Sequence, residues 1–237
     1  MNYPEKIREQ AEAILVRYPE GRERSALLPL LHLVQSHDGY VSEDGIAFCA
    51  EVLGITKAQV QAVSTFYTMY KREPAGDWLV SVCTNTLCQA KGGQKVFDAL
   101  SDELDVGHDE TTVDGKITLE HAECLAACDY APVVTVNYEF YDDMDEAKAL
   151  DLVRELKEGR RPVPSRGAPL CTLREISVQL AGFEEERPAG LEGNAQGEAT
   201  LAGARLAAEA GITAPAFDPD APLLADDGAV KQPEEAK

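Results

Sequence analysis

The sequence lacks the features of a secreted, membrane-spanning or nucleic-acid-binding protein. Its longest apolar stretch, from Ser25 to Val34, is far too short to cross a bilayer. The opening residues, MNYPEKIREQAEAILVRYPEG, carry charges every few positions, so we expect no signal peptide. Positive charge is scarce: 22 Lys and Arg stand against 42 Asp and Glu, a net charge of −20. This balance argues against a nucleic acid or an anionic membrane surface as a direct partner.

A dinucleotide-binding fingerprint is also missing. Gly92 and Gly93 adjoin one another, but the G-x-G-x-x-G pattern does not occur. We therefore expect no dinucleotide to bind here, and we expect no catalytic site on this chain alone. The acidic residues between Asp142 and Glu146 are better explained as helix-start charges than as acid–base catalysts.

Four cysteines in two close pairs dominate what is present. Cys83-x4-Cys88 and Cys124-x3-Cys128 are separated by thirty-five residues. Four thiolates complete the coordination of either a zinc ion or a [2Fe–2S] cluster. Structural zinc knuckles usually present thiols two residues apart, whereas the wider x4 and x3 loops suit the larger two-iron rhomb. The spacing favours iron–sulfur and leaves zinc as the alternative.

The remaining interpretations of the cysteines and histidines are less favoured. Six cysteines allow three disulfides, but these need an oxidising compartment, and we expect a reduced, cytoplasmic protein. Cys49 lies among apolar residues and is interpreted as a buried thiol, and neither Cys49 nor Cys171 is assigned as a ligand. His121, three residues before Cys124, is not needed as a ligand beside four cysteines and is expected to face solvent or a partner.

The first part of the chain predicts a bundle of four short helices. Ser42 is expected to cap the third helix, and Thr56 with Gln59 forms a capping box for the fourth. The expected helices are 5–17, 25–37, one from Ser42 to Gly54, and one that begins after Thr56.

The next part predicts a small sheet with helices against it. The expected order is a strand at 78–82 ending at Cys83, a helix after Gly93, strands at 117–123 and 133–136, and a helix at 147–156 capped by Asp143. This β–α–β–β–α order is that of a thioredoxin-like layer, with both cysteine pairs in loops at strand ends. Thr84 and Thr86 are either hydroxyl donors to the cluster or ordinary loop caps.

The expected organisation has four parts. A helical bundle at 1–75 precedes a thioredoxin-like [2Fe–2S] domain at 76–160. A C-terminal extension follows at 161–182, and a disordered acidic tail at 183–237, with transient helix around 199–210.

Three motifs carry a specific resemblance: Val82-Cys-Thr-Asn-Thr-Leu-Cys88, Glu123-Cys-Leu-Ala-Ala-Cys128 with the following Ala131-Pro132-Val133, and Val63-Ser-Thr-Phe-Tyr-Thr-Met-Tyr70. Together they resemble the thioredoxin-fold [2Fe–2S] subunit family of bacterial NADH–quinone oxidoreductase, respiratory complex I. The similarity spans about residues 7 to 159. Ala126 departs from the glycine usual in that family; if the turn needs a positive φ, the loop has to adjust.

The resemblance implies a one-electron carrier with one [2Fe–2S] cluster held by Cys83, Cys88, Cys124 and Cys128. It implies a neighbouring subunit that binds FMN and oxidises NADH, other peripheral-arm partners, and a cytoplasmic location at the inner face of the plasma membrane through the complex. Members of this family also occur in NAD-linked formate dehydrogenases and hydrogenases, so those assemblies stay open. A zinc-stapled interaction module without redox function is the other alternative.

Overall fold

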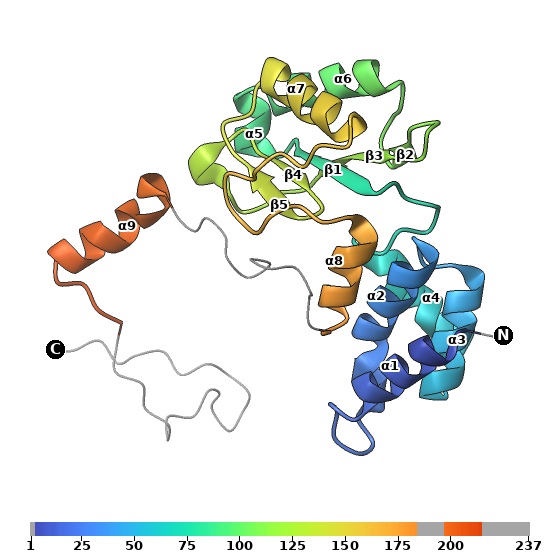
Figure 1. Cartoon of the computed structure of the whole chain (residues 1–237). Coiled ribbons are helices and arrows are strands. Elements are labelled where there is room, and N and C mark those ends of the chain that lie inside the picture. Colours follow the sequence, from blue (N-terminus) through green and yellow to red (C-terminus); the bar gives the residue numbers. More distant parts are fainter. Residues whose placement is uncertain (1–2, 184–196, 215–237) are drawn as a thin grey trace, which may run out of the picture. The chain divides into compact units, whose positions relative to one another are not determined.

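The computed structural model describes residues 3–183 and 197–214, and the chain divides into two compact units whose boundary lies between Gln196 and Gly197. The first unit holds a helical part and an α/β layer, and the described part of the second, residues 197–214, holds the helix α9 (Figure 1). The units are described separately.

Four α-helices and one 3₁₀ helix form the helical part, as the hydrophobic periodicity predicts. Ser42 accepts a hydrogen bond from the Gly45 N–H, and both halves of the Thr56–Gln59 capping box are present, so these predicted helix starts are confirmed. The apolar faces of the helices meet around Ile14, Leu30 and Phe48, all essentially inaccessible to solvent. The elements are α1 (Glu5–Leu15), η1 (Glu23–Ala26), α2 (Leu27–Asp38), α3 (Glu43–Leu53) and α4 (Lys57–Phe66).

A five-stranded sheet follows, with strand order β2-β3-β1-β4-β5. β1 pairs parallel with β3, and its other neighbour, β4, is antiparallel, as are the pairs β2–β3 and β4–β5. The strands are β1 (Trp78–Cys83), β2 (Glu110–Thr111), β3 (Ile117–Ala122), β4 (Val134–Val136) and β5 (Glu139–Tyr141). The helices of this layer are α5 (Thr86–Ala90), α6 (Gly93–Leu104), η2 (Cys128–Tyr130) and α7 (Glu146–Lys157).

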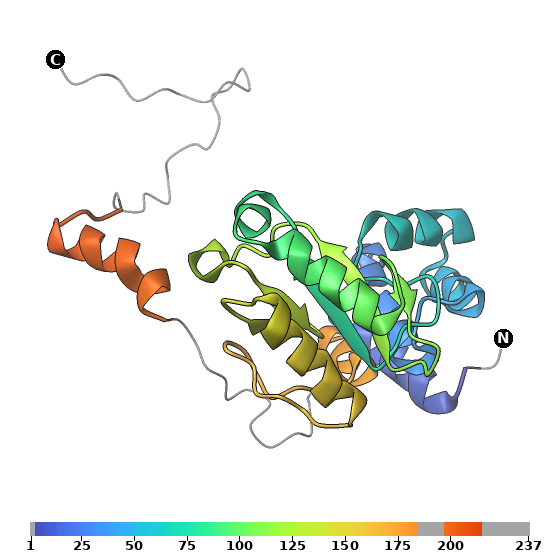
Figure 2. The same cartoon turned by 90° about the horizontal axis from the view of Figure 1, so that it is seen from above.

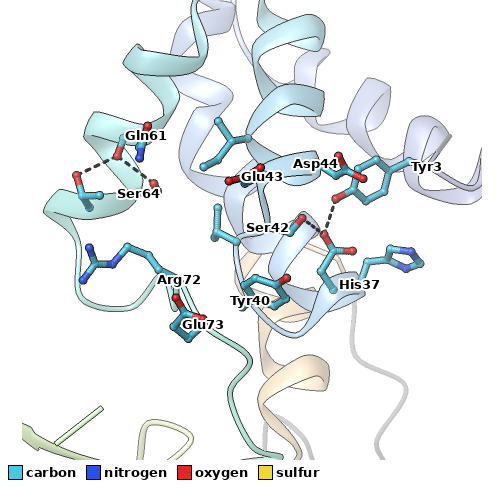
Figure 3. Close-up of a pocket in the computed structure, with 14 residues that line it drawn as sticks. Tyr3, His37, Tyr40, Ser42, Glu43, Asp44, Gln61, Ser64, Arg72 and Glu73 are labelled. Atoms are coloured by element: carbon cyan, nitrogen blue, oxygen red, sulfur yellow. Dashed lines mark hydrogen bonds between the residues drawn. The ribbon is translucent and has the colours of Figure 1, made fainter. Parts of the chain in front are cut away.

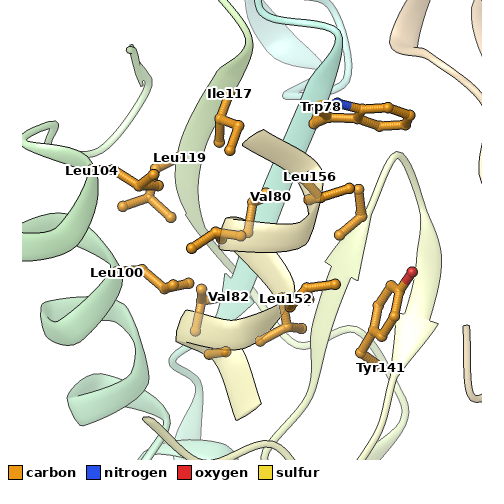
Figure 4. Close-up of a cluster of buried hydrophobic side chains, with 14 of the residues drawn as sticks. Trp78, Val80, Val82, Leu100, Leu104, Ile117, Leu119, Tyr141, Leu152 and Leu156 are labelled. Carbon is orange, nitrogen blue, oxygen red and sulfur yellow. The ribbon is translucent and has the colours of Figure 1, made fainter. Parts of the chain in front are cut away.

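The main core of this layer lies between the sheet and two helices. Figures 1 and 2 show α6 and α7 side by side on one face of the sheet. Alternate residues of the strands point toward these helices. The close-up shows side chains from β1, β3, α6, α7 and β5 meeting in one cluster, including Val80, Leu100, Leu119 and Leu152 (Figure 4).

The opposite face of the sheet is covered by the C-terminal extension. Leu79 of β1 packs there against Cys171, Leu173 and Ile176. Helix α8 (Leu173–Leu180) also packs against α2 of the helical part (Figure 1). Both faces of the sheet are therefore covered at β1, which explains why all six residues of this strand are buried.

The sequence predicts most of these elements but misses several. Strands β2 and β5 and the helices α5 and α8 are not among the predicted elements. The predicted cap of α7 is wrong: Asp145, not Asp143, accepts the hydrogen bond from the Lys148 N–H, while Asp143 itself has a left-handed φ of 49° in the preceding turn. One position separates the two acids, so sequence alone does not choose between them.

The predicted acidic tail lies partly outside the described residues, namely 184–196 and 215–237. Between these, α9 (Glu198–Glu209) is helical, near the helix expected around 199–210. Within the described ranges no single helix is long and apolar enough to cross a membrane. Helices α3 and α4 pass that test together, by length and composition only, with a bend of 119° between them.

Candidate iron–sulfur site

Parallel strand pairing brings the two cysteine loops to one edge of the sheet. Cys83 is the last residue of β1 and pairs with Ala122, the last residue of β3. Cys124 follows two residues later. Because the carboxyl ends of parallel neighbours lie at the same edge, the loop that leaves each strand begins beside the other. The two strand-end loops predicted from sequence are thus adjacent in the fold.

The first pair is held by the short helix α5. Asn85 caps it by accepting a hydrogen bond from the Thr86 N–H, and Cys88 lies within it. The Asn85 amide also donates to Glu123 at 2.7 Å, so it ties the first loop to the residue before Cys124. The Thr86 hydroxyl is directed to Asn85 at 3.3 Å, which matches the loop-cap interpretation of this threonine.

Helix α6 approaches the first loop closely at Gly93. A Cβ built on Gly93 would lie 2.5 Å from the Cys83 carbonyl oxygen and 2.9 Å from that of Cys88. Only glycine fits at this distance, since neither carbonyl belongs to a movable side chain. The backbone at both cysteines therefore packs against the start of α6.

The second pair lies in a tight turn. The Cys124 and Cys128 Sγ atoms are 3.7 Å apart. Ala126, between them, has a φ of 57°, so this turn does need the positive φ that glycine adopts freely. The loop keeps that conformation with alanine. The Ala131–Pro132 peptide that follows is cis.

Electrostatic interactions link the thiols of the two pairs. Burial raises the pKa of Cys88 to about 11, a hydrogen bond with Cys83 adds to this, and a backbone hydrogen bond from Val133 acts in the opposite direction. The hydrogen bond with Cys124 raises the pKa of Cys128, and the charge of Cys83 contributes. The structure therefore brings the four predicted ligands, Cys83, Cys88, Cys124 and Cys128, into one site.

The pairs differ in exposure. Cys83 and Cys88 are 2 % and 3 % accessible and pack with Ala127, Ala131 and Val133, whereas Cys124 and Cys128 are exposed. One side of the site therefore faces the protein interior and the other faces solvent.

The donor set fits a [2Fe–2S] cluster. Two thiolates on one tetrahedral metal, at a metal–sulfur distance of about 2.3 Å, lie roughly 3.8 Å apart, and the 3.7 Å between Cys124 and Cys128 matches this. A two-iron cluster takes two thiolates at each iron, which is the pairing seen here. Within residues 3–183 and 197–214 no three His, Cys, Asp or Glu side chains form a group arranged for a single metal ion.

Cys49 is buried and His121 is exposed, as the sequence predicts. Cys49 and Cys171 are buried in apolar clusters away from the pairs, and burial raises the pKa of Cys49 to about 12. The six cysteines, all of them within the described residues, form no disulfide. The centre of the His121 ring lies 4.1 Å from that of His108, with the two rings tilted by 42°, and the His121 backbone N–H donates to His108 Nδ1.

A separate pocket of about 810 Å³ lies in the helical part and contains no cysteine. The hydroxyls of Tyr3 and Ser42 donate to the same carboxylate oxygen of Asp38, at 2.6 Å and 2.5 Å. Figure 3 shows Tyr3 and Ser42 on one side of the pocket and Arg72 on the other. Its polar groups come from segments far apart in sequence, and sequence reasoning missed it.

Sequence reasoning also missed the residues that position the cysteine loops. Asn85 carried a signal, because Asn is a preferred residue immediately before the first turn of a helix. The close contact of Gly93 with the two cysteine carbonyls has no local signal, because it depends on how α6 packs.

Comparisons with known proteins agree on one family. The profile of the thioredoxin-like [2Fe-2S] ferredoxin family matches residues 11–157. The chain is 51 % identical over 210 residues to the E subunit of NADH-quinone oxidoreductase from Mycobacterium tuberculosis, covering 89 % of this chain and 82 % of that protein. It is 39 % identical to the protein of the same name from Rickettsia prowazekii, over 61 % of this chain and 82 % of the relative.

A solved structure supports the fold. A chain of an NAD⁺-reducing [NiFe]-hydrogenase, in the air-oxidized state, superposes with a TM-score of 0.51 at 16 % identity. The match covers 56 % of this chain and 23 % of that one. At this identity the likeness concerns fold alone.

Proposed function

The chain belongs to the thioredoxin-like [2Fe-2S] ferredoxin family, and from this we propose that it is the electron-transfer subunit of an NADH–quinone oxidoreductase. It carries one [2Fe–2S] cluster on Cys83, Cys88, Cys124 and Cys128. The observation that supports this most directly is the convergence of two thiol pairs at one sheet edge, with the second pair at 3.7 Å. The cluster supplies one-electron transfer when bound.

The chain's own residues control access to the site and its charge. The inner pair, Cys83 and Cys88, is shielded from water by the side chains of Ala127, Ala131 and Val133. The outer pair, Cys124 and Cys128, stays open to solvent. Reduction adds one negative charge, so the acids around the outer pair disfavour it. Glu123 and Asp129 adjoin Cys124 and Cys128, and we expect a negative reduction potential.

The partner is a subunit that binds FMN and oxidises NADH, with which the cluster exchanges single electrons. The two relatives named as E subunits of NADH-quinone oxidoreductase, at 51 % and 39 % identity, support this assembly over a formate dehydrogenase or a hydrogenase. In this proposal the chain is cytoplasmic and reaches the inner face of the plasma membrane through the complex. Purification under mild conditions tests it: a flavin-binding chain that oxidises NADH is expected to co-purify.

Metal analysis with EPR tests the cofactor. Protein purified without air is expected to contain about two irons and two sulfides per chain, with no signal when oxidised and one S = 1/2 signal after dithionite. One zinc per chain with no signal, from cells grown with ample iron, rejects electron transfer and supports a zinc-stapled binding module.

Cysteine substitution tests the ligand assignment. Cys83→Ser and Cys124→Ser each remove one thiolate and are expected to lose most of the iron. Cys49→Ser is the control, because that thiol is buried in the helical core far from the site. Equal iron content in all three variants contradicts the assignment.

A further inference from the structure

Arg166 lies outside the residues that the family profile matches, 11–157, yet it reaches the second cysteine loop. Its segment continues the sheet beyond β5. The Phe140 N–H donates to the Arg166 carbonyl oxygen at 3.0 Å, and the Ser165 N–H donates to the Phe140 carbonyl oxygen at 2.8 Å. Backbone pairing thus fixes where the Arg166 side chain begins.

The Arg166 side chain is 18 % exposed and bridges two carboxylates. It donates to Asp142 at 2.6 Å and to Asp129 at 3.4 Å. Its guanidinium also lies over two aromatic rings, 5.4 Å from the centre of Tyr130 and 5.3 Å from that of Phe140. Asp129 and Tyr130 directly follow Cys128.

The loop after Cys128 is joined to the same region by its backbone. The Asp143 N–H donates to the Tyr130 carbonyl oxygen and the Met144 N–H to that of Pro132, both at 2.9 Å. Phe140 packs against the apolar cluster that contains Cys83 and Cys88. Arg166 therefore contacts both the loop that follows Cys128 and Phe140, which packs against the apolar cluster around Cys83 and Cys88.

We infer that Arg166 is a positioning residue for the outer cysteine pair. By bridging Asp129 to Asp142, it holds Cys128 where the thiolate can bind the cluster. The positive charge of Arg166 also makes the bound cluster easier to reduce. This inference rests on the proposed function. A guanidinium bridges two carboxylates with a planar fork, whereas a lysine ammonium keeps only the charge.

The experiment compares the full-length wild type with Arg166→Gln, Arg166→Lys and the control Arg160→Gln. Arg160 lies in the same segment but is 55 % exposed and pairs with Glu155 and Glu158, away from the cysteines. Two readouts are used: amide hydrogen exchange of residues 128–144 in the cluster-free protein, and an EPR-monitored redox titration of the loaded protein.

Arg166→Gln is expected to exchange about tenfold faster over residues 128–144 and to hold less iron. Its one-electron equilibrium is expected to shift about tenfold toward the oxidised form, which is roughly 59 mV more negative. Arg166→Lys is expected to exchange at an intermediate rate and to recover most of the potential, and Arg160→Gln is expected to match wild type. Exchange and potential equal to wild type in Arg166→Gln overturn the inference.

Two further outcomes are separable. If Arg166→Gln does not fold, Arg166→Lys decides: faster exchange of residues 128–144 supports the positioning role, and unchanged exchange overturns it. If the wild type itself binds no [2Fe–2S] cluster, the proposed function fails and the effect on the potential is overturned with it, while the exchange readout still decides whether Arg166 positions Cys128.

Discussion

Single residues at the site store strain, and Ala126 is the clearest case. Its φ of 57° lies in the left-handed region, where a Cβ costs about 1–2 kcal/mol. We predict that Ala126→Gly raises the free energy of unfolding by about 1 kcal/mol, measured by urea denaturation of the cluster-free protein.

Its neighbour Ala127 is the matched control. Ala127 has a φ of −112° and is buried, so glycine there relieves no strain and removes a packed methyl group. We expect Ala127→Gly to destabilise the protein by about 1 kcal/mol. If both alanine-to-glycine variants lower the free energy of unfolding, the proposed strain at Ala126 is contradicted.

His32 on α2 makes stability depend on pH. It is 5 % exposed beside Tyr70, and burial lowers its pKa to about 4. In the unfolded chain its pKa is about 6.5, so below that pH the unfolded state takes up a proton that the folded state does not. This contribution is fully present above pH ~6.5 and is lost as pH falls toward 4, on the order of 3 kcal/mol in all.

His32→Leu separates this effect from that of the acids, which also titrate in this range. The variant keeps a buried apolar side chain and has no imidazole to protonate. We expect its unfolding free energy to fall less steeply than that of wild type between pH 6.5 and pH 4. Parallel curves for the two proteins count against His32 as the cause.

At the scale of elements, the contact of α6 with the first cysteine loop depends on Gly93. Because a Cβ would meet two backbone carbonyls, Gly93→Ala must push α6 away from Cys83 and Cys88. We predict a loss of about 2 kcal/mol in stability, of the size that overpacking costs, together with reduced iron content.

Gly203→Ala in α9 is the control for this change. A Cβ there meets nothing within 4 Å, so only helix propensity changes, which favours alanine by roughly 1 kcal/mol. Iron per chain is expected to stay at the wild-type value. Similar iron in both variants contradicts the close contact at Gly93.

Elements with local signals were predictable, and those that depend on distant partners were not. Ser42 and the Thr56–Gln59 box identify their helices because a cap bonds to its own first turn. Thr172 and Glu175 form a similar box for α8 that was overlooked. By contrast β5 has three residues and exists because β4 and the Arg166 segment pair with it.

The candidate site follows the same division. Cysteine spacing predicts the ligands, and the strand order predicts that both pairs lie in loops at strand ends. That these loops meet at one edge follows from the parallel pairing of β1 with β3. The contacts of Asn85 with Glu123 and of Arg166 with Asp129 span 38 and 37 residues, and no local pattern specifies them.

At the scale of the whole molecule, Lys71 joins the helical part to the sheet. Its side chain is 8 % exposed and contacts Asp109 at 2.8 Å and Glu120 of β3. Its backbone N–H donates to Gln35 of α2 at 2.8 Å. Burial alone would lower the pKa of Lys71, but Glu120 and Asp109 raise it above its usual value, so the ammonium stays charged.

Removing the Lys71 ammonium leaves the Glu120 carboxylate, which is only 15 % exposed, without its cation. We predict that Lys71→Met costs about 3 kcal/mol in urea denaturation, the size found when one partner of a buried pair is removed. The double variant Lys71→Met with Glu120→Gln is expected to recover part of this loss. Lys57→Met at the exposed start of α4 is expected to change little, and an equal loss there argues against a buried pair.

The return of α8 to the helical part sets an order in time. Ala181 is fully buried in the helical core, and its carbonyl oxygen accepts a hydrogen bond from Arg17, 164 residues earlier. At roughly 5–20 residues per second, a ribosome needs on the order of ten to thirty seconds to make that interval. The helical core therefore cannot include Ala181 until the entire cysteine-bearing layer has been synthesised. The two cysteine loops are consequently complete in sequence before α8 can pack against the helical part.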